Sequence, residues 1–442
     1  MSDRTRTQGG WSEARAEGRL RSLELFGMRF GLDRMRRMMT ALGSPERSYE
    51  TIQVLGTNGK TSTTRMTAAI LERHGLRTGA YTSPHLTAYR ERVQLGEREL
   101  AAADFSAAIA RADRAAEQVN RTLAEDDHVT QFELLTAAAL WELAEQGVEV
   151  AVIEAGLGGR YDATSVVEAA VTVLTNVGLE HTRWLGPTIT DIAEEKLAVV
   201  RPRGTLVLGE GLAPDALAVA ERVAEERGAR IVHAEPLPAS VPLASRGPFQ
   251  RRNFAVARAA AAAYLAHKGI ELDAEAVREA AAATVVAGRV QTVAEDPLTV
   301  LDGAHNPDAV AALVEAMPGI FGSTPPALVL GVLEDKDAAE MLKLLLPVCA
   351  RTWFTAPPSE RALSPAALES QARQLGFTDT RCEPRPARAL EAAREWASEH
   401  GAAVLATGSV YLVGELLAQL SGETAEQDGD AVAGLRAGGA GR

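Results

Sequence analysis

Short apolar runs alternate along the chain with longer stretches of helical periodicity. In the first half these runs are rich in apolar and β-branched residues, and each ends at a glycine or a polar residue: 51–55, 149–153, 171–174 and 205–208. Runs of this length and composition are typical of buried strands. Their alternation with helices predicts parallel sheets joined by crossover helices, and therefore an α/β fold. Such sheets bind ligands at the carboxyl ends of their strands, so the residues after each run are the first candidates for a site.

A second series of strand-like runs indicates a second domain. It comprises residues 299–301, 327–330, 352–355 and 403–406. Before it, residues 254–283 are rich in alanine at helical spacing, which predicts helix. Gly288 interrupts that pattern, so we expect the first domain over residues 19–287 and the second over 288–421. We expect disorder at both ends, in residues 1–18 and in the tail 422–442, which is rich in glycine and alanine.

Composition narrows the class of protein. A length of 442 residues fits two or three domains, and 46% apolar with 24% charged residues is ordinary globular usage. A net charge of −13 argues against a surface built for nucleic acid. Two cysteines, Cys349 and Cys382, are too few for a disulfide framework. The chain has neither an apolar leader nor a run of the roughly 18 apolar residues that a membrane span needs. We therefore expect a cytoplasmic protein with no membrane or nucleic-acid partner.

The strongest chemical signal is the sequence LGTNGKTS at residues 55–62, between a predicted strand and a predicted helix. Glycines let backbone N–H groups surround phosphate oxygens, and the start of a helix adds partial positive charge. We expect Lys60 to reach the terminal phosphates and a hydroxyl to meet Mg²⁺. Val54 stands where the strict GxxxxGK[ST] pattern needs glycine, so the loop is a variant. Its expected ATP contacts are Asn58, Gly59, Lys60, Thr61 and Ser62.

The variant loop GTNGK resembles that of the Mur ligase superfamily, which includes folylpolyglutamate synthases and dihydrofolate synthases. Further stretches are similar to this folate branch, in the correct order: FGLDRM at 30–35, TSPHL at 82–86, FELLTA at 132–137, EAGLGGRYDAT at 154–164, TNVGLEH at 175–181, LDGAHNP at 301–307, GVLEDKD at 331–337 and TGSVYLVGE at 407–415. The resemblance implies an N-terminal P-loop-type parallel-sheet ATPase domain and a C-terminal Rossmann-like α/β domain. It also implies a monomeric ligase that uses ATP to join L-glutamate to dihydropteroate, tetrahydrofolate or both through an acyl phosphate.

The resemblance assigns two Mg²⁺ sites, with Ser83, Glu154, His181 and Lys196 as their ligands. Glu154 and His181 each follow a predicted strand, so both are expected at the ligand-binding edge of the sheet. The ammonium of Lys196 would repel a metal ion. In related enzymes the matching lysine is carbamylated by CO₂, which replaces the cation with a carboxylate-like group. The chain departs from the family here, because Leu197 and Ala198 stand where alanine and glycine are usual.

The resemblance also assigns residues from both domains to ATP: Asn253, Arg289 and Asp302, with His305 close by. A guanidinium near the domain junction binds phosphate with two parallel hydrogen bonds. The family usually has tryptophan and proline before Gly288, where this chain has Val286 and Ala287. The candidate catalytic residues are Lys60, His181, Lys196 and His305.

For the pterin-bearing acceptor, the resemblance assigns two short stretches: Thr130, Gln131 and Phe132, and Tyr161, Asp162 and Ala163. The ring of Phe132 is suited to stack on a flat heterocycle, and the carboxylate of Asp162 to accept its N–H donors. Ordinary packing for Phe132 and helix capping for Asp162 are the alternatives.

Two other functions stay open at this point. Thr61 follows Lys60 where folate enzymes commonly carry glycine and cell-wall Mur ligases carry threonine, which favours a ligase acting on a UDP-muramoyl peptide. The departures around Lys196 and Arg289 keep a second alternative open, namely a nucleotide-binding homologue without ligase activity. The choice between dihydropteroate and tetrahydrofolate depends on the shape of the pocket rather than on a motif.

Overall fold

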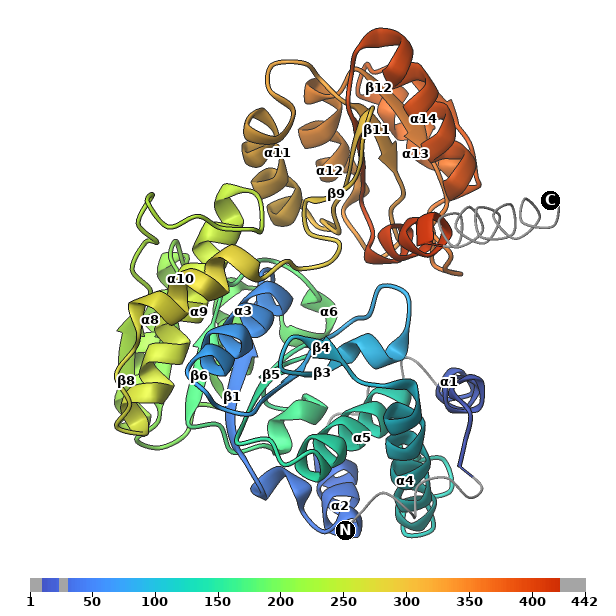
Figure 1. Cartoon of the computed structure of the whole chain (residues 1–442). Coiled ribbons are helices and arrows are strands. Elements are labelled where there is room, and N and C mark those ends of the chain that lie inside the picture. Colours follow the sequence, from blue (N-terminus) through green and yellow to red (C-terminus); the bar gives the residue numbers. More distant parts are fainter. Residues whose placement is uncertain (1–9, 24–30, 422–442) are drawn as a thin grey trace, which may run out of the picture. The chain divides into compact units, whose positions relative to one another are not determined.

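The computed structural model describes residues 10–23 and 31–421, which form two compact units (Figure 1). The first unit contains the described residues up to 84, together with 89–245 and 249–285. The second contains 85–88, 246–248 and the described residues from 286 onward. Phe30 of the FGLDRM motif, the first nine residues and the tail from 422 lie outside the described residues. Within the described ranges, no helix is long and apolar enough to cross a membrane.

The first unit is built on an eight-stranded sheet in the order β4-β3-β2-β5-β1-β6-β7-β8. Its strands are β1 Glu50–Leu55, β2 Thr78–Tyr81, β3 Val93–Leu95, β4 Arg98–Glu99, β5 Val150–Glu154, β6 Val171–Leu174, β7 Thr205–Leu208 and β8 Arg230–His233. The six strands from β2 to β8 in this order are parallel, and β3 and β4 add an antiparallel edge. In the register of the sheet, Val54 pairs with Glu154 and Leu55 pairs with Leu174. The carboxyl ends of β1, β5 and β6 therefore lie side by side.

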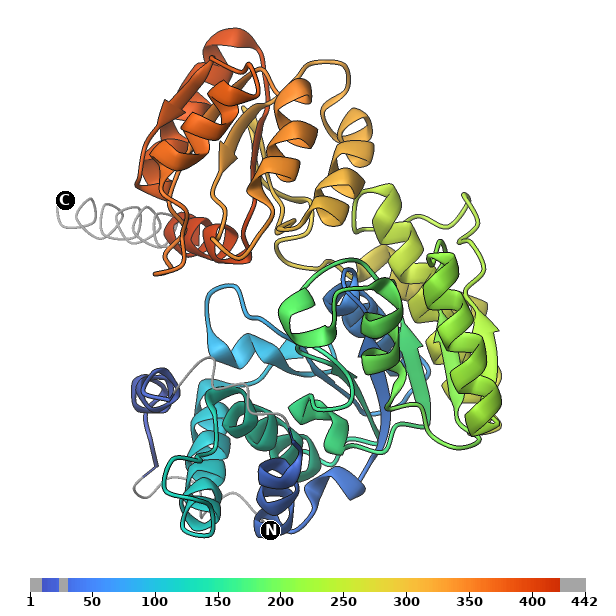
Figure 2. The ribbon, with the colours of Figure 1, turned by 180° about the vertical axis from the view of Figure 1, so that it is seen from behind.

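Helices cover both faces of this sheet (Figures 1 and 2). The helices of this unit are α1 Glu13–Arg21, α2 Asp33–Leu42, η1 Pro45–Arg47, α3 Lys60–Arg73, η2 Tyr89–Arg92, α4 Ala102–Asn120, α5 Gln131–Glu145, η3 Ala163–Val166, α6 Thr182–Leu185, α7 Ile189–Leu197, α8 Pro214–Arg227, α9 Pro248–His267 and α10 Ala274–Ala283. One core joins α1, α2, α4 and α5 to the sheet through residues such as Met35, Phe105 and Ile153. Another joins α7 and α8 to it through Ile192 and Leu206.

Two helical segments differ from the sequence-based expectation. Residues 13–18 lie in α1 instead of being disordered, because Ser12 caps that helix by accepting a hydrogen bond from the backbone N–H of Arg15. The alanine-rich stretch 254–283 is two helices, α9 and α10, rather than one. Gly269 adopts a left-handed φ of 71° just after α9, and Asp273 caps the start of α10. Local capping signals thus override the continuous alanine pattern.

The second unit has a six-stranded sheet in the order β13-β12-β11-β14-β10-β9. Its strands are β9 Gln291–Glu295, β10 Leu298–Leu301, β11 Ala327–Leu330, β12 Arg351–Phe354, β13 Thr380–Cys382 and β14 Val404–Thr407. Its helices are α11 Pro307–Phe321, α12 Ala338–Leu345, η4 Leu346–Val348, α13 Pro365–Gln374 and α14 Pro386–His400, and residues 410–421 are also helical. All strands are parallel except β9, which pairs antiparallel with β10. The α/β class with two parallel-dominated sheets is confirmed.

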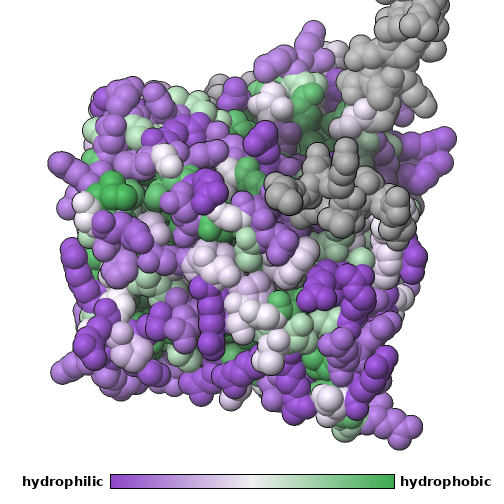
Figure 3. Space-filling model, turned by 60° about the horizontal axis from the view of Figure 1, so that its bottom comes forward, coloured by the Kyte–Doolittle hydropathy of each residue, from purple (hydrophilic) through white to green (hydrophobic). Residues whose placement is uncertain are grey.

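On the face shown in Figure 3, hydrophilic residues predominate and hydrophobic residues appear in small separate areas. Among the described residues, the exposed large hydrophobic side chains are those of Tyr161, Leu179, Ile270 and Val285. Tyr161 and Leu179 both follow strands of the first sheet at its carboxyl edge, where β5 and β6 end.

Candidate functional site

The phosphate loop lies between the end of β1 and the start of α3, and its glycines are sterically required. Gly56 has a φ of 145° and Gly59 a φ of 81°, which side-chain-bearing residues rarely adopt. A Cβ on Gly56 would collide with the hydroxyl of Thr175, and one on Gly59 would collide with the amide oxygen of Asn253. The loop is therefore in close contact with β6 on one side and with α9 on the other. Asn253, predicted to bind ATP, lies next to Gly59 although 194 positions separate them in the chain.

Residues at the end of β6 hold the phosphate loop in shape. The side-chain oxygen of Asn176 accepts hydrogen bonds from the backbone N–H groups of Thr57 and Asn58, at 3.2 and 2.8 Å. The hydroxyl of Thr175 donates to the carbonyl of Asn58 at 2.7 Å. Both residues belong to the TNVGLEH motif, which by itself indicates no role for either of them. The signal that was available is a polar pair directly after a buried strand that neighbours the loop strand.

The charged end of Lys60 lies over the loop. Its ammonium donates to the carbonyl of Thr57 at 3.0 Å, and α3 begins at Lys60 itself. Ser62 is buried, and Thr61 is half-buried on the first turn of the helix. The loop thus combines a lysine with the amino end of a 14-residue helix, which is an arrangement suited to phosphate.

Glu154 connects three elements at the edge of the sheet. It ends β5, is only 1% exposed, and accepts a hydrogen bond on each carboxylate oxygen. The hydroxyl of Thr61 donates to Oε1 at 3.0 Å, and the backbone N–H of Ser83 donates to Oε2 at 3.1 Å. Three predicted site residues therefore meet here. The carboxylate and the neighbouring hydroxyl of Thr61 are hard oxygen donors of the kind that Mg²⁺ prefers.

His181 is placed differently from Glu154. It has a left-handed φ of 55° at the start of the short helix α6, and its Nε2 lies 3.9 Å from Oε1 of Glu180. Its side chain is 36% exposed, so it borders solvent. In the part of the chain that the structure describes, no group of three or more His, Cys, Asp or Glu side chains is arranged to hold a metal. A metal ion bound at Glu154 would therefore need further ligands besides His181, such as hydroxyl oxygens and the oxygens of a carbamylated lysine.

Lys196 is buried at the end of α7 and reaches the phosphate loop. Its ammonium donates to the carbonyl oxygens of Gly56, at 3.1 Å, and Leu157, at 3.2 Å. Burial, together with the nearby positive charge of Lys60, lowers the pKa of Lys196 to about 7. A large fraction of this side chain is therefore a neutral amine near pH 7. A Cβ on Gly159 would collide with the backbone at Lys196, so the GLGG loop packs directly on this lysine.

The residues predicted to bind the acceptor lie around Gly156. A Cβ there would lie 2.6 Å from Cζ of Phe132 and 3.2 Å from Oδ2 of Asp162. The Phe132 ring also lies 6.4 Å from that of Tyr81, measured between centroids. Asp162 accepts hydrogen bonds from the backbone N–H groups of Leu157 and Thr164 and caps η3, so it has the capping role weighed as an alternative. Of the same stretch, Tyr161 is 45% exposed and Ala163 is buried.

Gln131 has a structural role in this arrangement. Its buried side-chain amide donates to the carbonyl of Leu20 at 2.8 Å and to the hydroxyl of Tyr89 at 3.3 Å. Thr130 caps α5 in a reciprocal pair of hydrogen bonds with Glu133. Of the three predicted residues at the start of α5, Phe132 alone has a side chain that reaches Gly156 among the contacts described.

In the second unit, three predicted residues gather at the carboxyl end of β10. Asp302 is buried and accepts hydrogen bonds from the backbone N–H groups of Val290, at 2.9 Å, and Ala304, at 2.8 Å. Burial raises the pKa of Asp302, and the guanidinium of Arg289 opposes this shift. Arg289 packs on Gly303, where a Cβ would collide with its Nη1, and a ring nitrogen of His305 lies 2.8 Å from the Gly303 carbonyl.

The backbone beside Arg289 is strained. Val290 has a φ of 49°, which is unusual for a β-branched residue, and it is held there by the bond from its N–H to Asp302. The sequence departs from the family pattern just before this point, at Val286 and Ala287. The strain therefore lies where the segment between the two sheets enters the second unit.

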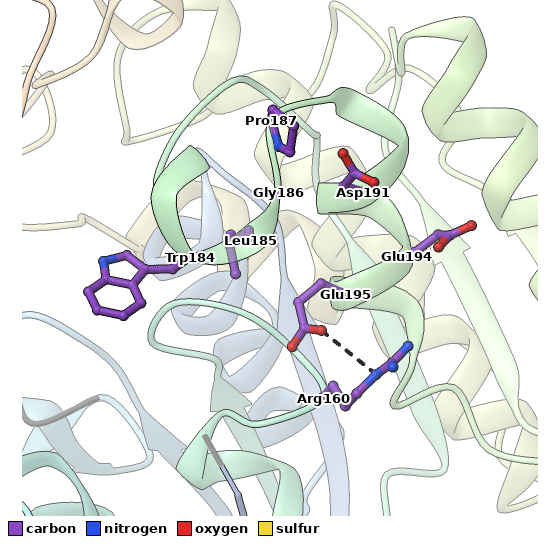
Figure 4. Close-up of a pocket in the computed structure, with 8 residues that line it drawn as sticks. All are labelled: Arg160, Trp184, Leu185, Gly186, Pro187, Asp191, Glu194 and Glu195. Atoms are coloured by element: carbon purple, nitrogen blue, oxygen red, sulfur yellow. Dashed lines mark ion pairs between the residues drawn. The ribbon is translucent and has the colours of Figure 1, made fainter. Parts of the chain in front are cut away.

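A hollow of about 300 Å³ opens beside α7 (Figure 4). Its lining comprises Arg160, Trp184, Leu185, Gly186, Pro187, Asp191, Glu194 and Glu195. Arg160 turns toward Glu195 across it, with Nε 3.7 Å from Oε2. Glu194 pairs with Arg222, and Asp191 caps α7, so the charges in the wall are largely engaged. None of the residues predicted to bind ATP, metal or acceptor lines this hollow.

Comparison with known families matches both units. Residues 54–209 match the Mur ligase middle domain, and residues 288–410 match the glutamate ligase domain of Mur ligases. Folylpolyglutamate synthase of Lacticaseibacillus casei is 35% identical over 369 residues, covering 76% of this chain and 84% of that protein. A probable bifunctional folylpolyglutamate synthase/dihydropteroate synthase of Haloferax volcanii is 35% identical over 419 residues, or 89% of this chain. The chain spans about half of that relative, 49% of its length.

Solved structures agree with these matches. Mycobacterium tuberculosis folylpolyglutamate synthase, complexed with ADP and AMPPCP, superimposes with a TM-score of 0.85 at 29% identity, covering 92% of this chain and 99% of that one. Escherichia coli FolC in complex with DHPP and ADP gives a TM-score of 0.82 at 28% identity, covering 94% of this chain and 99% of that one. The similarity thus extends over both units.

Proposed function

The chain belongs to the folylpolyglutamate synthase/dihydrofolate synthase family of Mur ligases, and we propose that it is an ATP-dependent ligase that joins L-glutamate to a folate-type acceptor. Dihydropteroate, tetrahydrofolate or both are the proposed acceptors, and we propose that the enzyme acts as a monomer. The similarity to proteins solved with ADP, AMPPCP and DHPP supports this proposal.

One observation carries the proposal: the buried carboxylate of Glu154 binds Thr61 of the phosphate loop and the backbone of Ser83. This bond ties the end of β5 directly to the loop that carries Lys60. Here the carboxylate lies beside the lysine-bearing loop, so the lysine is placed for the phosphates of a nucleoside triphosphate and the carboxylate for the metal ion that accompanies them. The hydrogen bond from Thr61 gives this threonine a use in a folate enzyme, so it no longer favours a cell-wall ligase.

The donor set fits Mg²⁺. Ser83, Glu154 and His181 supply hydroxyl, carboxylate and imidazole, and we assign one ion to them; when bound, it neutralises the charge on the transferred phosphoryl group. We assign a second ion to Lys196 after carbamylation. The neutral amine required for attack on CO₂ is available because the pKa of Lys196 is lowered to about 7. The amine nitrogen bonds to the carbon of CO₂ and releases one proton, which leaves a carbamate anion.

The proposed reaction has two chemical steps. A carboxylate oxygen of the acceptor attacks the terminal phosphorus of ATP, and ADP leaves. The α-amine of glutamate then attacks the acyl phosphate and displaces inorganic phosphate. In this scheme Lys60 and the start of α3 neutralise the phosphates, and Asn253 lines the loop beside Gly59. We also assign Arg289, Asp302 and His305 to the nucleotide, and Phe132, Tyr161 and Asp162 to the acceptor.

The test is a coupled assay of ADP release with Mg²⁺, ATP and L-glutamate, offering dihydropteroate, tetrahydrofolate or a UDP-muramoyl peptide in parallel. We expect ADP and phosphate in equal amounts with a pteroyl acceptor and no turnover with the muramoyl peptide. Turnover with the muramoyl peptide alone would identify a cell-wall ligase. Binding of Mg·ATP without turnover on any acceptor would identify a nucleotide-binding homologue. Mass spectrometry of the product checks that one glutamate is added per ADP.

A further inference from the structure

We propose that Arg34 is a positioning residue for the acceptor, because it fixes the first turn of α5, from which Phe132 projects. This inference rests on the proposed function, since it takes Phe132 as part of the acceptor site. Arg34 lies in α2, and the match to the Mur ligase middle domain begins only at residue 54. A helix that precedes the matched domain thus helps to position the acceptor.

The link from Arg34 to α5 is a buried ion pair. Nε of Arg34 lies 3.0 Å from both carboxylate oxygens of Glu133, and both side chains are about 8% exposed. Nη1 of Arg34 also donates to Asp127 at 2.9 Å, just ahead of α5. The guanidinium thus holds two acidic groups, one on each side of the point where the helix begins.

Glu133 connects Arg34 to the start of α5 through further hydrogen bonds. Its Oε2 accepts hydrogen bonds from the backbone N–H of Thr130, at 2.9 Å, and from its hydroxyl, at 3.0 Å. The backbone N–H of Glu133 in turn donates to the Thr130 hydroxyl at 3.3 Å. Phe132 lies between these two residues, so its backbone has little freedom to move. Its ring meets Gly156 and the ring of Tyr81, and a small rotation of the first turn would displace it from both.

A second contact supports the same end of α5. Gln131 donates to the carbonyl of Leu20, at the end of α1, and to the hydroxyl of Tyr89 in η2. The two helices that precede the matched domain therefore both reach the first turn of α5. Packing of the hydrophobic core does not by itself require these polar contacts to α5. Apolar residues of the same helices, such as Leu20 and Met35, are already fully buried in the shared core.

The test uses a double variant that lacks both charges of the ion pair, which separates an effect on acceptor positioning from an effect on stability. R34M leaves the carboxylate of Glu133 buried without its cation, so thermal stability and acceptor binding should both fall. The double variant R34M/E133Q removes both charges, and glutamine retains the capping bonds to Thr130, so we expect the melting temperature to recover. The KM for the pteroyl acceptor should stay raised by roughly tenfold or more, while the KM for ATP stays unchanged. R34K, which keeps the charge but not the forked geometry, should lie between wild type and R34M.

Arg37 provides the matched control. It lies one turn further along α2, is 44% exposed, and pairs with Asp33 and with Thr122 rather than with α5. R37M should therefore leave both KM values within about twofold of wild type. The inference is overturned if R34M/E133Q recovers the acceptor KM together with its melting temperature, or if the KM for ATP rises as much as that for the acceptor. A wild-type protein with no activity on any pteroyl acceptor would instead overturn the proposed function.

Discussion

Two buried cations of the first unit, Lys196 and Arg34, have opposite surroundings. Both are almost fully buried, at 3% and 7% exposure. Arg34 forms ion pairs with Glu133 and Asp127, whereas Lys196 donates to two backbone carbonyls and lies near the positive charge of Lys60. The bonds of Arg34 to its acidic partners outweigh burial and raise the pKa of the guanidinium. The pKa of Lys196 falls to about 7.

The difference separates a structural cation from a reactive one. A buried charge that is paired with carboxylates is held permanently charged, and its loss leaves the partners uncompensated. The ammonium of Lys196 bonds to carbonyl oxygens, and burial together with Lys60 outweighs the opposing charges of Glu180, Asp162 and Glu195, so this lysine loses its proton more easily and becomes a nucleophile. Burial by itself therefore does not identify a site residue; the chemistry of the partners does. Variants at these two positions are expected to fail in different ways.

The largest effect is expected for Lys196→Arg. Arginine keeps a positive charge but presents no neutral amine to CO₂, so kcat for ADP release should fall on the order of 1000-fold. The melting temperature is a necessary second measurement, because the longer side chain enters a packed site. A ¹³C spectrum recorded in labelled bicarbonate should show a carbamate resonance in wild type that Lys196→Arg lacks. The exposed pair of Lys268 with Glu50 supplies the control, and Lys268→Arg should keep full activity.

Next in size is the loss of stability in Arg34→Met. Removal of the cation leaves Glu133 buried without compensation, and the free energy of unfolding should fall by about 3–5 kcal/mol. Denaturation by urea, followed by circular dichroism, measures this change. The double variant with Glu133→Gln should recover most of it. Equal losses in the single and double variants would mean that the packing of the arginine stem, and not charge compensation, stabilises this region.

The sequence predicts those features of the fold that have a local signal. Apolar runs identified most central strands of both sheets, such as β6 and β7, because burial on both faces leaves a local signature. The signal for the phosphate loop is equally local, because the spaced glycines and the start of the following helix lie within a few residues of one another. The edge strands β4 and β8 carry more exposed residues, and no run of apolar residues marks them.

Partnerships between distant residues escaped prediction. Arg34 and Glu133 are 99 positions apart, and Asn176 lies 118 positions from the backbone N–H of Asn58 that it binds. Each residue has an unremarkable local context, and only the order of strands and helices brings the pair together. Gln131, which the resemblance assigns to the acceptor, likewise donates its amide N–H groups to the distant Leu20 and Tyr89. The sequence indicates which residues are polar, whereas the fold determines which of them have spare bonding capacity.

Lys196 also predicts a pH dependence of stability. Its folded pKa, about 7, lies below the ordinary value of 10.5, so between these values the unfolded chain binds more protons than the folded one. Stability must then rise with pH across this window, by about 2 kcal/mol between pH 7 and pH 9. The measurement compares the free energy of unfolding of wild type with that of Lys196→Met in CO₂-free buffer. Since methionine does not titrate, the difference between the two proteins should grow with pH; a constant difference would contradict the lowered pKa.

The smallest effect is expected for Asp127→Asn, which weakens one of the two acidic partners of Arg34. The Asp127 side chain is 24% exposed, so solvent screens its charge more than that of Glu133 at 8%. Asparagine still accepts the hydrogen bond from Nη1, and we expect a loss of about 1 kcal/mol in the free energy of unfolding. Glu133 keeps its bonds to Arg34 and Thr130, so the KM for the acceptor should remain within about twofold of wild type. A loss as large as that of Arg34→Met would show that the two carboxylates hold the arginine jointly, and that Glu133 alone does not suffice to fix the first turn of α5.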